Sequence, residues 1–217
     1  MIFLYEIFIR TYYLMIRLYA NFSLKARQFV EGRKNWQERV EKIAASKNKK
    51  IWLHCASLGE FEQGRPVVER LRQDLPNHEI IITFFSPSGY EVRKNYKGAD
   101  HVIYLPMDTR CNAKKFLQLI SPDLVVFVKY EFWFNYISEL HRRDIPLYMI
   151  SVNFRTGQHY FKWYGTWFAK QLRKVAFFFV QNERSRDLLH SIDIKNVKVS
   201  FLKCLQKEES LSVFTTS

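Results

Sequence analysis

The chain has 217 residues, 47% hydrophobic, 25% charged and 17% aromatic, which excludes intrinsic disorder and allows one substantial core or two small ones. Its 34 Lys and Arg against 21 Asp and Glu give a net charge of +13, which favours an anionic partner, although such a charge also serves solubility alone. The three cysteines, Cys55, Cys111 and Cys204, form no CxxC or Cys/His cluster, so they argue against a disulfide framework or zinc site and indicate a reducing compartment.

Residues 1–22 predict an amphipathic helix that lies on a membrane surface. The segment is rich in Ile, Leu, Phe and Tyr, but Glu6, Arg10 and Arg17 make it a poor membrane-spanning helix. At helical pitch these three charges share one face, and the remaining surface is apolar and aromatic. The alternative is a helix that packs on the protein or on a partner, with its charged stripe in water. The basic connecting segment of residues 23–50 follows, with cations suited to anionic lipid head groups at Lys25, Arg27, Arg33 and Lys34.

From residue 51 onward, short apolar runs alternate with segments of helical periodicity. The expected strands are residues 51–56, 79–85, 102–105, 123–128, 147–151, 176–181 and 197–199. The expected helices are residues 63–75, 88–95, 112–120, a helix that ends at 143, 160–173 and 183–191. This alternation predicts a Rossmann-like α/β domain over residues 51–200, a parallel sheet with helices on both faces. GxGxxG and Walker A motifs are absent from the sequence, which removes the simplest nucleotide-binding interpretations.

The loops that follow the strands are the candidate site, because ligands of parallel sheets bind beyond the carboxyl ends of the strands. The first loop contains Ser57, Gly59 and Glu60. Gly59 permits a tight turn or a close approach of substrate. Glu60 is either a helix-start residue or a catalytic base, and its position at the carboxyl end of a strand strengthens the catalytic interpretation. In the second loop, Ser88 and Gly89 open a helix whose free N–H groups are either simply capped or hold a phosphate.

Later loops bring further polar residues to the same edge. Asp108 is interpreted as a turn or helix cap. Glu131 is either a local ion-pair or helix-start residue, or a second carboxylate near Glu60, and Asn135 follows it. Arg155 suits a phosphate or carboxylate, or pairs locally on the surface.

Together these loops resemble those of a known family, the Kdo (3-deoxy-D-manno-octulosonic acid) transferases of lipopolysaccharide assembly. The resemblance covers residues 33–199 and rests on six segments in the family's order: WLHCASLGE, TFFSPSGYE, YLPMD, VKYEFWFN, ISVNFR and FVQNE. It implies the N-terminal, acceptor-binding half of a B-type glycosyltransferase fold, whose other half binds CMP-Kdo. It also implies Glu60 as the general base of an inverting transfer to lipid IVA, a phosphorylated lipid A precursor, without metal or cofactor.

The resemblance further implies a location on the cytoplasmic face of the inner membrane. The expected substrate-binding residues are Ser57, Gly59, Ser88, Gly89, Glu131, Asn135 and Arg155. No nucleic-acid-binding motif is visible, so a nucleic-acid partner is not expected.

The chain departs from the family pattern in two places. Many members read Glu-x-Glu-x-Trp-Pro-Asn where this chain has Lys129 for the first glutamate and Phe134 for the proline. Glu131 is therefore expected to be a structural or acceptor-side carboxylate. The second departure is residues 201–217, an atypical tail without a donor-binding motif, which predicts a truncated acceptor-side half that is inactive alone. The alternative is a non-catalytic, membrane-associated module that binds an acidic glycolipid.

Overall fold

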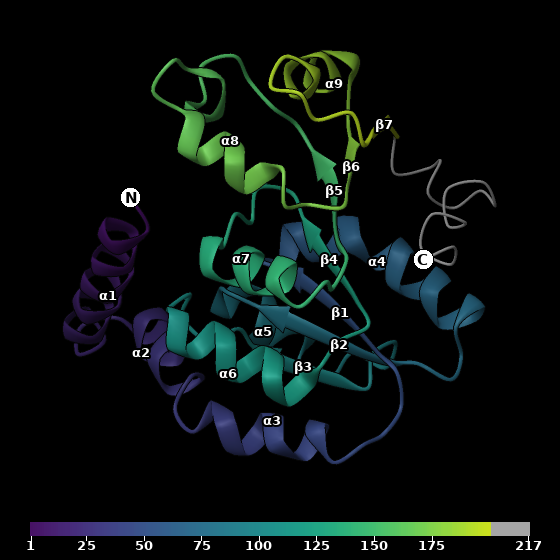
Figure 1. The fold of residues 1–217 in the computed structure, drawn as a ribbon. Coiled ribbons are helices and arrows are strands. Elements are labelled where there is room, and N and C mark those ends of the chain that lie inside the picture. Colours follow the sequence, from purple (N-terminus) through teal and green to yellow (C-terminus); the bar gives the residue numbers. More distant parts are fainter. Residues whose placement is uncertain (201–217) are drawn as a thin grey trace.

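The computed structural model describes residues 1–200, which form an α/β domain around one seven-stranded sheet (Figure 1). The atypical tail expected over residues 201–217 lies outside the described residues. The strands are β1 (Lys50–Cys55), β2 (Glu79–Phe84), β3 (His101–Tyr104), β4 (Leu124–Val128), β5 (Leu147–Val152), β6 (Phe177–Val180) and β7 (Val197–Val199). Every neighbouring pair is parallel, in the order β3-β2-β1-β4-β5-β6-β7. The predicted parallel sheet is therefore confirmed, with each strand within one residue of its expected bounds.

Helices cover both faces of the sheet, as expected. They are α1 (Ile2–Tyr19), α2 (Leu24–Glu31), α3 (Trp36–Ala44), α4 (Leu58–Asp74), α5 (Pro87–Arg93), α6 (Arg110–Ile120), α7 (Phe134–Arg142), α8 (Thr166–Leu172) and α9 (Glu183–His190). Alternate side chains of β1 enter two separate cores. Trp52 packs with residues of α3, α6, α7 and α8, whereas Leu53 and Cys55 pack with residues of α4. Because both faces are covered, the central strands β1 and β4 are buried along their whole length.

Two helices differ from the sequence prediction. The long aromatic helix expected over residues 160–173 is wrong: a 3-10 turn, η1 (His159–Phe161), precedes α8, which begins only at Thr166. Gly165 lies so close to the His159 carbonyl that a Cβ would overlap it, so the chain turns there instead of continuing a helix. Helix α4 begins at Leu58, five residues before its expected start at residue 63, and therefore includes Glu60 in its first turn.

The predicted N-terminal helix is present as α1, and it is docked on the domain. Ile9 is buried against residues of α2 and the loop after β3, namely Phe29, Val30 and Met107. Arg10 and Arg17 are exposed, whereas Glu6 turns toward the protein and accepts a hydrogen bond from the Arg110 backbone N–H. Among residues 1–200 no helix has the length and apolar character needed to cross a membrane.

The connecting segment 23–50 contributes to the core of the domain. Val40 and Ile43 of α3 are buried in the same cluster as Phe116 of α6. Arg33, expected to face lipid head groups, is instead buried, because its guanidinium lies among aromatic rings and main-chain carbonyls.

Candidate functional site

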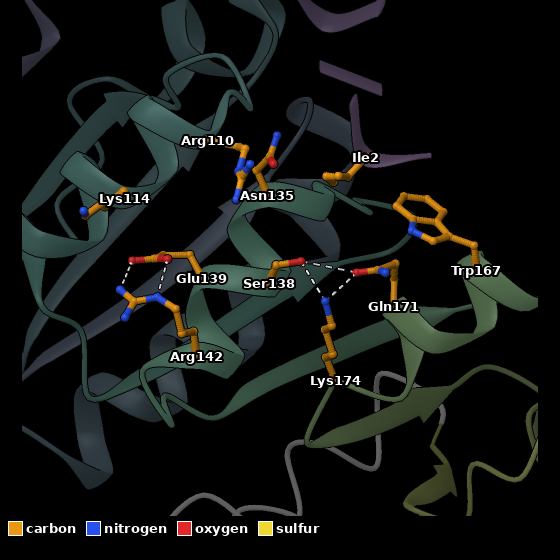
Figure 2. A pocket seen from close by; sticks show the side chains of 10 residues that line it. All are labelled: Ile2, Arg110, Lys114, Asn135, Ser138, Glu139, Arg142, Trp167, Gln171 and Lys174. Atoms are coloured by element: carbon orange, nitrogen blue, oxygen red, sulfur yellow. Dashed lines mark hydrogen bonds and ion pairs between the residues drawn. The ribbon is translucent and has the colours of Figure 1, made fainter. Parts of the chain in front are cut away.

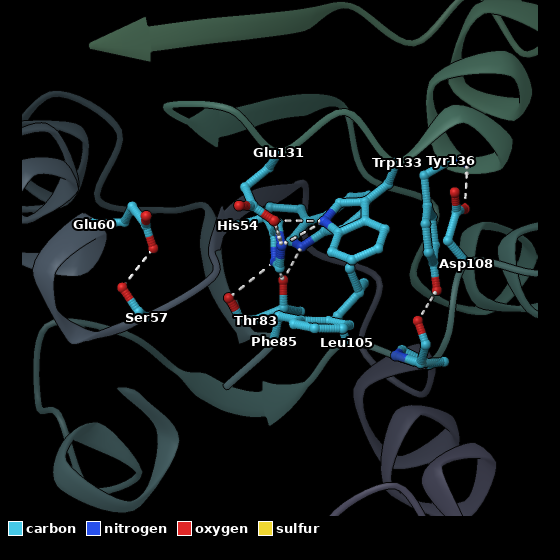
Figure 3. A network of polar contacts seen from close by, with 12 residues as sticks. His54, Ser57, Glu60, Thr83, Phe85, Leu105, Asp108, Glu131, Trp133 and Tyr136 are labelled. Atoms are coloured by element: carbon cyan, nitrogen blue, oxygen red, sulfur yellow. Dashed lines mark hydrogen bonds and ion pairs between the residues drawn. The ribbon is translucent and has the colours of Figure 1, made fainter. Parts of the chain in front are cut away.

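The carboxyl ends of β1 and β4 lie side by side, at the point where the order of the strands reverses. From β1 the chain crosses to β2 and β3 on one side, whereas from β4 it crosses to β5 on the other side. In sheets of this kind the loops diverge at such a point, and ligands bind between them. Glu60 follows β1 and Glu131 follows β4, so the fold brings the two predicted loops to this position (Figure 3).

Glu60 occupies the first turn of α4, behind the N-cap residue Ser57. The Ser57 hydroxyl donates a 2.6 Å hydrogen bond to Oε2 of Glu60. The carboxylate is half-buried, and within the described residues its Oε1 accepts no hydrogen bond. Glu60 thus has one fixed oxygen and one oxygen that can accept a proton from a ligand.

Glu131 is held by two neighbouring rings. Its Oε2 accepts a 2.7 Å hydrogen bond from the Trp133 indole N–H and lies 3.3 Å from Nε2 of His54. Burial raises the pKa of the Cys55 thiol, and the charges of both Glu60 and Glu131 raise it further. Since Cys55 ends β1, both carboxylates lie within electrostatic reach of the same strand end.

Ser88 and Gly89 lie at the start of α5, beside this edge. The N-cap is Ser86, whose hydroxyl accepts from the Ser88 backbone N–H and lies 2.9 Å from the Ser88 hydroxyl. Gly89 is buried, and a Cβ there would meet the Phe84 ring and the backbone of Ser57. Gly89 therefore allows α5 to approach the loop that carries Glu60, whereas phosphate binding at Ser88 and Gly89 stays a prediction.

Asn135 lies in the interior, next to Asp108. The Asp108 carboxylate is 1% exposed and accepts hydrogen bonds from Tyr5 Oη and from the backbone N–H groups of Asn135 and Tyr136. Desolvation raises the pKa of Asp108 to about 7. The Asn135 side chain donates to the Asp108 main-chain oxygen and to Glu6. These contacts give Asn135 a structural place between α1 and α7, and its substrate contact stays a prediction.

Strained backbone occurs at the ends of β4 and β5. Lys129 and Ser151 adopt left-handed conformations, with φ of 64° and 57°. Residues other than glycine rarely adopt such angles. Where they do, the strained positions are concentrated at functional sites. Arg155 lies in the loop after β5, two residues beyond Asn153, and it is exposed. Its backbone N–H donates a hydrogen bond to the side chain of Gln158. No side chain of residues 1–200 pairs with the Arg155 guanidinium, and its contact with a ligand stays a prediction.

Sequence reasoning did not select His54, although it is the polar member of a buried strand. Its side chain has no exposed surface and contacts both Thr83 and Glu131. The available signal was composition: a histidine inside an otherwise apolar strand needs hydrogen-bond partners, because an unpaired buried polar group is costly.

A hollow of about 620 Å³ lies elsewhere, between α6, α7, α8 and the start of α1 (Figure 2). Its lining includes Arg110, Lys114, Asn135, Arg142, Trp167 and Lys174. Within it Arg142 pairs with Glu139, and Lys174 donates to Ser138. Of the expected site residues it contains Asn135 alone, so this hollow and the two-carboxylate edge are separate features. In the described part of the chain, no three His, Cys, Asp or Glu side chains gather as a metal site.

Comparisons with known proteins identify relatives of the chain. The family model of 3-deoxy-D-manno-octulosonic-acid transferase (kdotransferase) matches residues 34–206. The 3-deoxy-D-manno-octulosonic acid transferase of Haemophilus influenzae is 35% identical over 97 residues, 44% of this chain and 23% of that protein. The enzyme of the same name from Chlamydia trachomatis is 26% identical over 156 residues, 69% of this chain and 35% of that protein. The chain thus spans about a quarter to a third of these relatives.

The fold is similar to that of solved UDP-N-acetylglucosamine 2-epimerases. One such structure has a TM-score of 0.53 at 16% identity and matches 71% of this chain and 48% of its own. The enzyme from Methanocaldococcus jannaschii has a TM-score of 0.51 at 14% identity and matches 76% of this chain and 52% of its own. At this identity the likeness shows the fold alone, and it confirms the expected half of a B-type glycosyltransferase architecture.

Proposed function

The chain belongs to the 3-deoxy-D-manno-octulosonic-acid transferase family, and on that basis we propose that it forms the acceptor-side half of an inverting glycosyltransferase. The donor is CMP-Kdo, and the acceptor is lipid IVA, a phosphorylated and acylated glucosamine disaccharide. The observation that carries the proposal is the pair of carboxylates, Glu60 and Glu131, at the ends of β1 and β4. This is the edge where B-type folds present ligands.

Glu60 is the general base of the proposed reaction. Ser57 holds Oε2 of the carboxylate, so Oε1 takes the proton from the acceptor hydroxyl. As it loses its proton, the acceptor oxygen attacks the anomeric carbon of Kdo from the side opposite CMP. The new C–O bond forms as the bond to CMP breaks, so the configuration inverts and CMP leaves with the electron pair. Glu131 holds another hydroxyl of the acceptor sugar.

Most of each relative's length has no counterpart in this chain. We place the CMP-Kdo site in a second Rossmann-like domain of the kind that completes a B-type fold. Residues 1–217 are expected to bind the acceptor but not to transfer Kdo alone.

Helix α1 supports association with a membrane surface, and from the family we propose that this surface is the cytoplasmic face of the inner membrane. Its docked face is the one that carries Ile9, and its outward face exposes large apolar side chains: Phe3, Leu4, Ile7, Phe8, Leu14, Met15 and Leu18. Arg10 and Arg17 are exposed next to this apolar face, where they can meet anionic head groups. A helix that lies in the interface would hold the domain beside its lipid-linked acceptor.

The test is a Kdo transfer assay with CMP-Kdo and lipid IVA, for this chain alone and for the chain extended by the donor domain of a relative. The extended chain is expected to transfer Kdo and the short chain is not. Glu60→Gln in the extended chain is expected to lower kcat by at least about 100-fold. Glu69→Gln, on the exposed side of the same helix, is the matched control. Full activity of the Glu60→Gln protein would overturn the assignment of the base.

A further inference from the structure

A buried series of hydrogen bonds runs from β1 and β2 to Glu131 (Figure 3). The Trp52 indole N–H donates to the Thr83 hydroxyl at 2.8 Å. The same hydroxyl lies 2.8 Å from Nδ1 of His54. On the other side of the ring, Nε2 of His54 lies 3.3 Å from Oε2 of Glu131. The carboxylate at the ligand edge is thereby linked to the interior of the sheet.

In a neutral His54 ring, these contacts favour one of the two nitrogens as the carrier of the proton. The Trp52 indole can only donate, so the Thr83 hydroxyl accepts from it and has its own proton free for Nδ1. When Nδ1 accepts, Nε2 carries the hydrogen and donates it to the Glu131 carboxylate. Every group in the series is then paired.

The other tautomer fits less well. It would turn Nδ1–H toward the Thr83 main-chain oxygen at 3.1 Å and leave a lone pair on Nε2 facing the Glu131 carboxylate. In that tautomer Nε2 would accept a 3.0 Å hydrogen bond from the Trp133 indole N–H, but this single proton has a shorter, 2.7 Å bond to Glu131. A lone pair 3.3 Å from a carboxylate oxygen is repulsive, so the geometry favours Nε2–H.

The consequence is that the two oxygens of Glu131 differ. Oε2 receives the N–H groups of His54 and Trp133, whereas Oε1 accepts no hydrogen bond from the described residues. Glu131 stands on a loop just after the strained Lys129, and a glutamate side chain has several rotatable bonds. A donor from a central, fully buried strand fixes this side chain before any ligand arrives, which lowers the entropy cost of binding.

We propose that His54 is a positioning residue for sugar recognition: its Nε2–H fixes Oε2 of Glu131 so that Oε1 accepts a hydrogen bond from a hydroxyl of the acceptor hexose. Thr83 sets the tautomer that makes this possible. The inference rests on the proposed function, because it requires a hydroxyl-bearing acceptor at this edge of the sheet.

The test is a calorimetric titration of residues 1–217 with an acyl-free glucosamine disaccharide bisphosphate. His54→Leu and Glu131→Gln are each expected to weaken binding about tenfold. The double variant is expected to bind no more weakly than Glu131→Gln, since His54 acts through Glu131. His54→Gln, whose amide can donate from the place of Nε2, is expected to recover most of the affinity. His101→Leu, at the opposite end of the sheet, is the matched control.

Nitrogen-15 NMR of labelled histidine gives a second readout. The unsubstituted chain is expected to show the Nε2–H tautomer at His54, and Thr83→Val is expected to change the tautomer and weaken binding. If circular dichroism shows that His54→Leu does not fold, Thr83→Val and His54→Gln are the variants that test the inference. Any one of three results would overturn the inference alone. The first is an Nδ1–H tautomer at His54, and the second is additive losses of affinity in the double variant. The third is unchanged affinity in all of His54→Gln, Thr83→Val and a folded His54→Leu. Absence of binding by the unsubstituted chain would overturn the proposed function, and the role of His54 with it.

Discussion

The Tyr5 hydroxyl donates a 2.6 Å hydrogen bond to the buried carboxylate of Asp108 and so ties the N-terminal helix to the loop after β3. Asp108 also accepts from two backbone N–H groups at the start of α7. One carboxylate therefore joins α1 and α7. The apolar outward face of α1 is held in a defined orientation relative to the two-carboxylate edge, because the helix that carries it is docked on the domain.

Tyr5→Phe is expected to destabilise the domain. It removes one donor from a carboxylate that is 1% exposed, and an unsatisfied buried acceptor costs about 1–3 kcal/mol. Urea unfolding followed by circular dichroism measures the loss. Tyr12→Phe, on the exposed side of α1, is the control and should leave the free energy of unfolding unchanged. Equal stabilities of the two variants would show that the hydrogen bond contributes nothing.

Stability is expected to fall as the pH rises through neutrality. Desolvation raises the pKa of Asp108 from 3.8 to about 7, so the folded chain holds a proton that the unfolded chain releases in this interval. The contribution of this protonated carboxyl group to the free energy of unfolding is complete below the pKa of the unfolded state. It is lost as the pH rises through the pKa of the folded state. The free energy of unfolding, measured by urea titration from about pH 5 to about pH 8, should decline less steeply in Asp108→Asn. Parallel curves for the unsubstituted chain and Asp108→Asn would show that Asp108 does not cause the decline in stability.

Arg33→Lys is expected to lower the free energy of unfolding by about 1–3 kcal/mol. The guanidinium donates to the main-chain oxygens of Leu105, Phe29 and Phe85 and lies 3.6 Å from the centre of the Phe29 ring. Burial lowers the pKa of Arg33 to about 9. An ammonium group cannot reproduce both the fork of donors and the planar stacking. The exposed Arg27→Lys is the control for thermal unfolding, and equal melting temperatures would refute the expectation.

Replacing Leu4 and Phe8 together by Gln is expected to weaken binding to vesicles of phosphatidylglycerol by at least about tenfold. Each large apolar side chain that enters the interface contributes about 1.5–3 kcal/mol. Both residues are 63% exposed on the outward face of α1, so the fold should be unaffected. Co-sedimentation measures the bound fraction, and Val92→Gln on α5 is the control for an exposed apolar residue elsewhere. Unchanged sedimentation would exclude α1 as the membrane-binding element.

Two glycines are expected to respond differently to alanine. Gly89→Ala should destabilise the domain by about 1–3 kcal/mol, since its Cβ would press on Phe84 and the Ser57 backbone. Gly59→Ala has open space and lies in the first turn of α4, so the fold should tolerate it. If Gly59 allows close approach of the acceptor, its alanine variant loses affinity in the calorimetric titration while its melting temperature is kept. Unchanged affinity of Gly59→Ala would remove this glycine from the site.

The local features of the fold were predictable because they depend on neighbours in the chain. Apolar runs such as residues 123–128 predict strands that end within a residue of the observed bounds. The break at Gly165 was missed because it depends on how closely the backbone approaches His159, which periodicity does not describe. Glu60 was selected from its place after a strand, although its hydrogen bond to Ser57 appears only in the folded geometry.

The sequence alone determined the alternation of strands and helices, the family resemblance and the loops where polar residues follow strands, since each is written in contiguous residues. Only the tertiary structure decided the strand order, which sets the loops after β1 and β4 side by side. It also paired residues far apart in the chain: Tyr5 with Asp108, and His54 with Glu131. Such pairs depend on which strands become neighbours, and on a buried polar group finding its partner there, so no local pattern specifies them.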